Sequence, residues 1–85
     1  MKQLIKLKID FTDQNILITG GSKGIGKRLV NDFQSLGGRV WYTGRSNTAL
    51  NDNYYFCVDF TNPYETTNFL KKIKDIDFDV LINNA

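Results

Sequence analysis

Residues 15–27 read NILITGGSKGIGK. An apolar run over residues 15–19 stops at a glycine, and three more glycines follow within the next six residues. A buried strand that ends in a glycine-rich turn and opens a helix forms a cradle for phosphate groups. Glycine permits the sharp turn and the close approach, while unpaired N–H groups at the helix start face the anion. This stretch therefore predicts a nucleotide site between a strand and a helix.

The spacing of the glycines narrows the kind of nucleotide site. Gly20, Gly24 and Gly26 follow the pattern Gly-x-x-x-Gly-x-Gly, and Ser22 and Lys23 lack the Gly-Lys-Ser/Thr order of a P-loop. The competing interpretation is a glycine-rich turn without a ligand. The strand before the glycines and a capped amphipathic helix expected after them favour the nucleotide site.

The rest of the chain alternates strands with helices. Further strands are expected at residues 40–43, 54–58 and 79–82, and helices from Gly24 to a left-handed stop at Gly37 and Gly38 and from Asn62 to about Lys74. Asn62 is the expected cap of the second helix, with proline next and Glu65 three residues on. The alternation predicts a parallel sheet of order 3-2-1-4 with helices on both faces, which is a partial Rossmann-type three-layer α/β fold.

Several positions carry expectations about burial. The sheet-facing side of the first helix is expected at its apolar positions, Ile25, Leu29, Phe33 and Leu36. Cys57 lies mid-strand without a basic neighbour and is expected to be a small buried hydrophobe. The aromatic residues of the strands are expected to pack in the core: Trp41, Tyr42, Tyr54, Tyr55 and Phe56. Residues 1–13 form an extended lead-in to a domain of residues 14–85, and residues 48–50 allow one helical turn at most.

Length and composition exclude several classes of function. Eighty-five residues make one small domain, and a net charge of +2 argues against nucleic acid or a membrane surface as partners. The chain has one cysteine and no apolar run of the length of a signal or a membrane span, so we expect a cytoplasmic protein. It also has no histidine. The alternating acids Asp75, Asp77 and Asp79 lack the glycine that a calcium loop requires, so no metal site is expected.

Three motifs resemble the classical branch of the short-chain dehydrogenase/reductase family. They are TGGSKGIG at residues 19–26, Asp59 after the third strand, and Asn83, Asn84 and Ala85 after the fourth. Over residues 11–85 the resemblance implies the cofactor-binding half of an oxidoreductase that transfers hydride between a nicotinamide dinucleotide and a carbonyl or alcohol. The family pattern continues with a glycine after Ala85, which is absent here.

The resemblance also implies which residues contact the cofactor. The loop at Gly20, Ser22, Lys23, Gly24, Ile25 and Gly26 would hold the pyrophosphate. Asp59 would bond the adenine amino group while Phe60 offers its backbone to the ring; the plainer role for Asp59 is a strand-end turn residue. Asn83 and Asn84 would brace the sheet centre or simply cap a strand, and Ala85 would lie near the ribose.

The residues after the second strand favour NADP over NAD. NAD sites usually carry an acid at the end of that strand, which bonds the ribose 2′-hydroxyl, but Gly44 occupies this position and Arg45 and Ser46 follow it. A guanidinium grips a 2′-phosphate with two charge-assisted bonds, and Lys23 adds a second cation. In the family, basic residues at these two places accompany NADP. The competing interpretation is that Arg45 and Lys23 are solvated loop charges.

No catalytic residue is expected in this chain. Catalysis in the family rests on a Ser, a Tyr and a Lys four residues after the Tyr, all beyond the fourth strand. The residues four places after Tyr54, Tyr55 and Tyr64 are Val58, Asp59 and Asn68. We therefore expect the amino-terminal half of an NADP-dependent carbonyl reductase or alcohol dehydrogenase, weakly stable and inactive alone.

Three other interpretations stay open: a non-catalytic nucleotide-binding module, one chain of a split enzyme, and a non-functional gene fragment. The fourth strand is expected to be an open apolar edge that invites either a carboxyl-terminal half or self-association.

Overall fold

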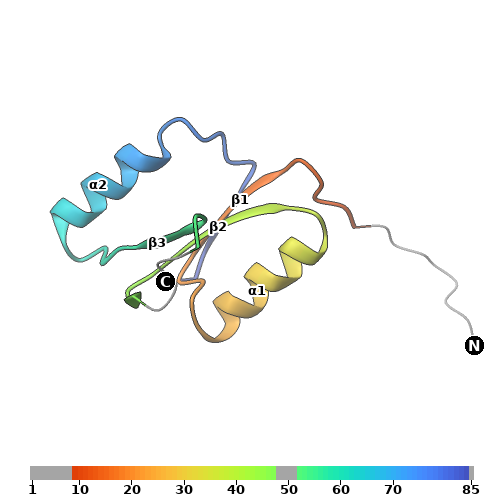
Figure 1. Ribbon diagram of the computed structural model, residues 1–85, viewed down its shortest axis with the longest axis horizontal. Helices are drawn as coiled ribbons and strands as arrows, with labels where there is room; N and C mark the ends of the chain where they lie inside the picture. The colour runs from red at the N-terminus through yellow and green to blue at the C-terminus, as the bar shows by residue number, and fades with distance from the viewer. Residues whose placement is uncertain (1–8, 48–51, 85) are drawn as a thin grey trace, which may run out of the picture.

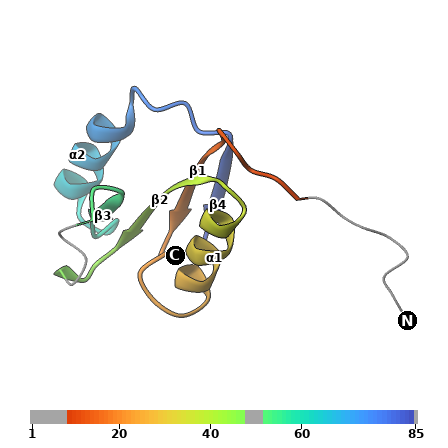
Figure 2. The same ribbon diagram turned by 45° about the vertical axis from the view of Figure 1, so that its right-hand side comes forward.

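The computed structural model describes residues 9–47 and 52–84. In chain order these contain β1 (Asn15–Thr19), α1 (Gly24–Ser35), β2 (Arg39–Gly44), β3 (Tyr55–Cys57), α2 (Pro63–Ile73) and β4 (Val80–Asn83). The strands pair in parallel in the order β3-β2-β1-β4, which confirms the expected topology. The helices α1 and α2 lie on opposite faces of the sheet (Figure 1 and Figure 2).

Strand β1 lies inside the sheet and is covered on both faces. Ile16 and Ile18 are fully buried on the face toward α1, where they pack with Val30 and Val40. Leu17 points to the opposite face, into a second cluster with Val58 and Phe69. A strand that is apolar at every position suits a parallel sheet with helices on both sides.

The buried face of α1 is partly the expected one, since Leu29 and Phe33 pack against the core cluster. The expectation for Ile25 is wrong: this residue is 75% exposed, and the buried positions of the helix are Gly26 and Val30. A Cβ at residue 26 would lie 2.0 Å from the carbonyl oxygen of Gly20, so only glycine allows the first turn to approach the loop this closely. Because Gly26 faces inward, the rotation of the helix turns Ile25 toward solvent. An apolar pattern cannot show this, since the residue that sets the rotation has no side chain.

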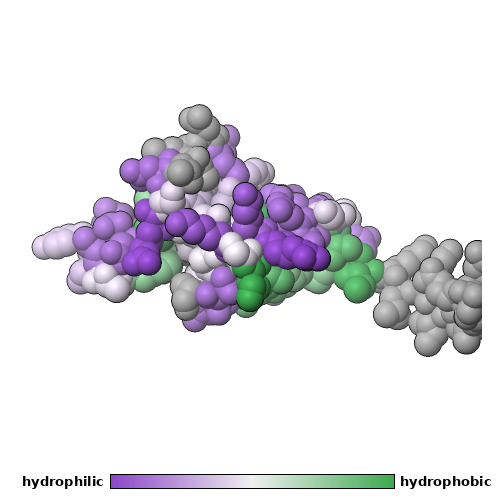
Figure 3. All heavy atoms as spheres, turned by 90° about the horizontal axis from the view of Figure 1, so that it is seen from below, coloured by the Kyte–Doolittle hydropathy of each residue, from purple (hydrophilic) through white to green (hydrophobic). Residues whose placement is uncertain are grey.

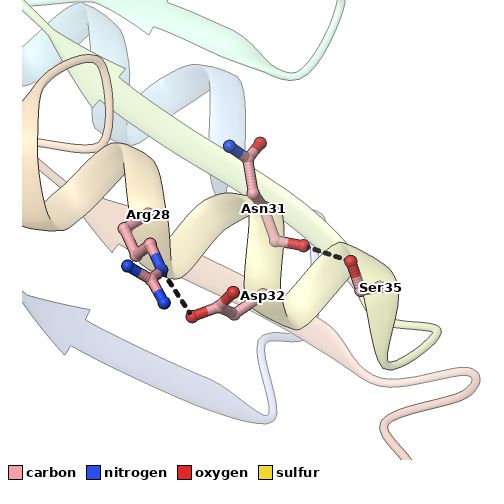
Figure 4. Close-up of polar contacts among 4 residues, drawn as sticks. All are labelled: Arg28, Asn31, Asp32 and Ser35. Carbon is pink, nitrogen blue, oxygen red and sulfur yellow. Dashed lines mark hydrogen bonds and ion pairs between the residues drawn. The ribbon is translucent and has the colours of Figure 1, made fainter.

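The outward side of α1 is polar. The Arg28 guanidinium lies 3.7 Å from the Asp32 carboxylate, and the Ser35 hydroxyl donates to the Asn31 carbonyl at 2.9 Å (Figure 4). Both contacts join residues one turn apart on an exposed surface, and an ion pair of this kind contributes only about 0.3 kcal/mol. Figure 3 views the molecule from this side, where hydrophilic residues cover most of the surface and apolar ones gather near the start of the described chain.

The end of α1 is closed by the expected glycines. Gly37 adopts a φ of 93°, and the Gly38 amide donates to the Phe33 carbonyl five residues earlier, as in a Schellman motif. Phe11 of the lead-in packs its ring edge-on against Phe33, and its amide donates to the Leu36 carbonyl. The end of the lead-in is therefore part of the packed domain, while Ile9 is exposed and residues 1–8 lie outside the described residues.

Helix α2 begins as the sequence predicts. The Asn62 side chain accepts hydrogen bonds from the amides of Tyr64 and Glu65, and proline occupies the first turn. Glu65, however, reaches back to the Asp59 amide at 3.0 Å, which lies before the cap. This contact ties the start of α2 to the end of the β3 segment.

Strand β3 is shorter than expected, and Cys57 was wrongly expected to be buried. Cys57 is exposed and its thiol donates to the Asn47 side chain at 3.3 Å. Cys57 is the last residue of β3, which lies at the edge of the described sheet and pairs with β2 alone, at Gly44. The expected aromatic packing is confirmed for Phe56, which contacts Phe69 edge-on, and for the buried Tyr55. It is wrong for Tyr54, which precedes β3 and is 41% exposed although its ring touches Trp41. The helical turn considered at residues 48–50 falls outside the described part of the chain.

Strand β4 forms the other edge among the described residues. Its first pairing is braced by Asn15, whose amide donates to the Asp79 carboxylate and whose side chain donates to the Asp77 carbonyl. The acids before β4 thus serve a turn that enters the strand. Leu81, on the face opposite to α1, is 65% exposed, so this edge carries an uncovered apolar residue.

Removing the Asn62 side chain tests how much this cap stabilises the start of α2. Asn62→Ala is expected to lower the free energy of unfolding by about 1 kcal/mol, because two amides lose their acceptor. The matched control is Asn68→Ala, at an exposed position within the same helix, which should leave stability unchanged or slightly raised. Urea unfolding of the full chain measures both, and equal stabilities for the two variants would contradict the capping role.

Candidate nucleotide-binding site

A cleft of about 690 Å³ lies at the carboxyl ends of β1, β2 and β3. The predicted site residues that line it are Gly20, Ser22, Lys23, Arg45, Ser46, Asp59 and Phe60. Four residues that the sequence analysis did not assign to the site complete the lining: Thr43, Gly44, Val58 and Thr61. Segments far apart in sequence meet here because all strands of a parallel sheet end on the same side.

The other predicted site residues that the structure describes are not in the lining of the cleft. Asn84 donates its side-chain amide to the Gly20 carbonyl at 3.1 Å and its backbone amide to the Thr19 hydroxyl. That hydroxyl in turn donates to Asn83. These contacts hold the start of the glycine loop against the end of β4. Gly24, Ile25 and Gly26 form the first turn of α1, and Ala85 lies outside the described residues.

Thr43 ties the glycine loop to β2 on its other side. The Gly20 amide donates to the Thr43 hydroxyl at 3.1 Å, and the Gly21 amide donates to the Thr43 carbonyl at 2.8 Å. Thr43 is almost completely buried, so its hydroxyl needs such a partner. Sequence reasoning passed over it, although a threonine among the apolar residues of a buried strand was a usable signal.

The start of α1 is not capped by a side chain, in agreement with the unpaired N–H groups expected there. Its N-cap residue, Lys23, makes no side-chain hydrogen bond to the helix, and the first turn contains no acid. Within the described ranges, the amides of Ser22, Lys23, Gly24 and Ile25 donate to no protein acceptor. Unpaired amides at the positive end of a helix dipole attract anions. The contrast with the capped start of α2 singles out this helix terminus.

Charged side chains lie around the cleft. Lys23 and Arg45 are both exposed at its lining. The hydroxyl and amide of Thr61 donate to one Asp59 oxygen and, with a smaller effect from the Arg45 guanidinium, hold the pKa of Asp59 below its ordinary value. Asp59 therefore carries a negative charge at neutral pH and serves the strand-end turn, the plainer of its two interpretations. Its adenine contact stays a prediction.

Comparison with known proteins agrees with this architecture. The family model described as short chain dehydrogenase matches residues 14–85. The chain belongs to the short chain dehydrogenase family. Short-chain dehydrogenase/reductase 3 of Homo sapiens is 32% identical over 92 residues, which cover 89% of this chain and 30% of the human protein. The 3-oxoacyl-(acyl-carrier-protein) reductase FabG of Rickettsia typhi is 35% identical over 85 residues, which cover 91% of this chain and 34% of the reductase.

Solved structures of the family superpose on the same fold. A short chain dehydrogenase from Leptospira borgpetersenii with bound NAD+ matches 98% of this chain with a TM-score of 0.72 and 28% identity. The RhlG/NADP active-site complex from Pseudomonas aeruginosa matches 92% of it with a TM-score of 0.74, and at 23% identity that likeness concerns the fold alone. This member spans about a third of the length of these relatives. Neither helix described here has the length and apolar character needed to cross a membrane.

Tyr42 on β2 and Tyr55 on β3 are paired in register, and the partners of their hydroxyls line different clefts. The Tyr55 hydroxyl donates to the Ser46 carbonyl at 2.5 Å, inside the cleft wall. The Tyr42 hydroxyl donates to the Asp52 carboxylate at 2.6 Å, beside a second, smaller cleft under α1. Burial, reinforced by the Asp52 carboxylate, raises the pKa of Tyr42 to about 12, and burial also raises the pKa of Tyr55.

Two positions of the loop require glycine for different reasons: Gly26 because there is no space for a Cβ, and Gly24 because its φ is positive. Gly26→Ala is expected to cost about 3 kcal/mol or more, because the new Cβ would overlap the Gly20 carbonyl. Gly24→Ala should cost only about 1–2 kcal/mol, since its surroundings are open and only its φ of 55° is unfavourable for alanine. Urea unfolding gives both values, and a smaller loss at residue 26 than at residue 24 would contradict the close approach.

Alkaline pH tests the Tyr42 environment. The unfolded tyrosine loses its proton near its ordinary pKa of 10.0, while the folded one keeps it up to about 12. Stability from this group is complete below pH 10 and is lost as the pH rises toward 12. Unfolding of Tyr42→Phe should therefore depend less on pH over this range than unfolding of the parent. Tyr64→Phe, at a side chain 84% exposed, should keep the parent's dependence.

Proposed function

We propose that this chain is the NADP(H)-binding portion of a short-chain dehydrogenase/reductase that reduces carbonyls or oxidises alcohols by hydride transfer. The observation that carries the proposal is the uncapped start of α1, which opens onto a cleft lined by Lys23 and Arg45. Unpaired amides suit a pyrophosphate, and two cations nearby suit a further phosphate group.

The residues take distinct roles in this proposal. The loop from Gly20 to Gly26 holds the pyrophosphate through its backbone, and Arg45, Ser46 and Lys23 bind the 2′-phosphate. Asp59 and Phe60 contact the adenine, with the Phe60 ring fixed edge-on to Phe69 at the cleft. Asn83, Asn84 and Ala85 support the loop and the ribose from β4.

The surroundings of Gly44 support NADP over NAD. Similar proteins have been solved with either dinucleotide, so likeness alone does not choose between them. The residue that would carry the acid of an NAD site is Gly44, and a Cβ there would lie 2.3 Å from the Ser22 hydroxyl oxygen. A carboxylate at this position would need the loop to move. The basic residue that follows is the available partner for the ribose substituent.

The catalytic step belongs to residues outside this sequence. None of its tyrosines is followed by lysine at the fourth position, and the relatives are about three times as long. We propose that the 85-residue chain binds the dinucleotide without reducing carbonyls, that it acts in the cytoplasm, and that the edge with Leu81 accepts a carboxyl-terminal half or a second copy. NADPH-dependent carbonyl reduction by the pure chain would contradict the first part.

Reversing the charge at residue 45 tests the cofactor assignment. Arg45→Asp should weaken NADPH binding by about 2 kcal/mol or more, because one charge-assisted contact is replaced by repulsion. NADH binding should change much less, since NADH has no 2′-phosphate. Calorimetric titration of the full chain with each dinucleotide measures both affinities.

Arg28→Asp is the matched control for this experiment. It makes the same charge change on the outward side of α1, away from the cleft lining, and should leave both affinities close to those of the parent (Figure 4). Equal binding of NADPH and NADH by the parent chain would refute the 2′-phosphate assignment. Binding of neither dinucleotide would refute the module as a whole.

A further inference from the structure

We propose that Tyr55 is a positioning residue of the 2′-phosphate site, whose hydroxyl fixes the segment carrying Arg45 to β3. The inference rests on the proposed NADP(H) function and adds a residue that neither the family motifs nor the cleft lining contains. Tyr55 is buried under the cleft wall, and it acts through its neighbours without touching the cofactor.

The Tyr55 hydroxyl holds the segment that carries Arg45. It donates to the Ser46 carbonyl at 2.5 Å, one residue after Arg45. The glycine loop passes close by, because a Cβ on residue 44 would lie 2.3 Å from the Ser22 hydroxyl oxygen and 2.7 Å from the Tyr55 hydroxyl oxygen. One phenol oxygen therefore fixes the strand-end segment beside the loop from which the cleft is built.

Gly44 provides the space for this hydrogen bond. A Cβ on residue 44 would lie 2.7 Å from the Tyr55 hydroxyl oxygen and equally close to the Ser22 Cβ. Gly44 cannot easily withdraw, because its carbonyl accepts the Val58 amide at 2.8 Å. Gly44 lacks the acidic side chain that an NAD site would carry, and the same lack of a side chain leaves room for the Tyr55 hydroxyl.

The hydrogen bond between Tyr55 and Ser46 lowers the conformational entropy that is lost when Arg45 binds a phosphate. Arg45 is exposed and, within the described ranges, forms no ion pair within 4.0 Å. A long side chain on an unrestrained segment loses conformational entropy when it is immobilised by a ligand. With its neighbour's carbonyl held by Tyr55, the segment keeps the arginine beside the cleft, so less ordering remains to be done on binding.

Tyr42 supplies a matched control. It pairs with Tyr55 in register, and the two rings lie 5.1 Å apart. Its hydroxyl is likewise hydrogen-bonded, but to Asp52, beside the smaller cleft. Tyr42→Phe therefore removes a comparable hydroxyl from the same sheet without touching the segment of Arg45.

The experiment uses two adenosine fragments that differ by one phosphate. The full chain, Tyr55→Phe and Tyr42→Phe are titrated calorimetrically with adenosine 2′,5′-bisphosphate and with 5′-AMP, after circular dichroism has verified folding. Tyr55→Phe should raise the Kd for the bisphosphate about fivefold, the usual value of one hydrogen bond, and change the Kd for 5′-AMP by less than about twofold. Tyr42→Phe should leave the ratio of the two Kd values as in the parent.

The outcomes separate this inference from the cofactor assignment. If the parent prefers the bisphosphate and Tyr55→Phe keeps that preference, the positioning role is overturned while the NADP assignment survives. An equal loss for both ligands, or the same change of ratio in Tyr42→Phe, also overturns it as a purely structural effect. A parent without preference overturns both proposals. Should Tyr55→Phe fail to fold, Gly44→Ala places a Cβ 2.7 Å from the Tyr55 hydroxyl oxygen and displaces it, and an unchanged ratio in that variant overturns the role.

Discussion

The contact between the first turn of α1 and the end of β1 is the constraint on which the rest of the structure depends. At Gly26 the helix lies so close to the Gly20 carbonyl that a single methyl group would overlap it. Asn84 and Thr43 hold the loop from its two sides, at Gly20 and Gly21. This closeness turns Val30 inward and leaves Ile25 in solvent.

The electrostatic character of the cleft is local and does not follow from the small net charge of +2. The positive end of α1, Lys23 and Arg45 lie around one cleft, while the Asp59 carboxylate on the same lining accepts two bonds from Thr61. Carboxylates elsewhere are engaged similarly: Asp79 braces β4 and Asp52 holds Tyr42. The cleft lining contains two cations and one carboxylate, so its side chains leave an excess of positive charge.

Sequence patterns predicted the local structure well where the residues that determine it lie within one element. The Asn62 cap, the Gly37 stop and the buried β1 strand all arise within a few residues. The errors at Ile25 and Cys57 have a different origin. Ile25 is apolar at the right spacing, but Gly26 sets the helix rotation, and Cys57 lies in an apolar strand that turns out to be a short edge. Burial depends on what packs opposite, which a single segment does not contain.

The amino-acid order alone determined the parallel α/β topology, the glycine loop and the two cations that flank it, because period, turn chemistry and charge are properties of short segments. Only the tertiary structure decided that Thr43 ties the loop to β2, that Gly44 has no room for a side chain, and that the Tyr55 hydroxyl binds the Ser46 carbonyl. These are contacts between strand ends brought together by the sheet, and their distances follow from strand register and helix approach. No pattern within one segment specifies them.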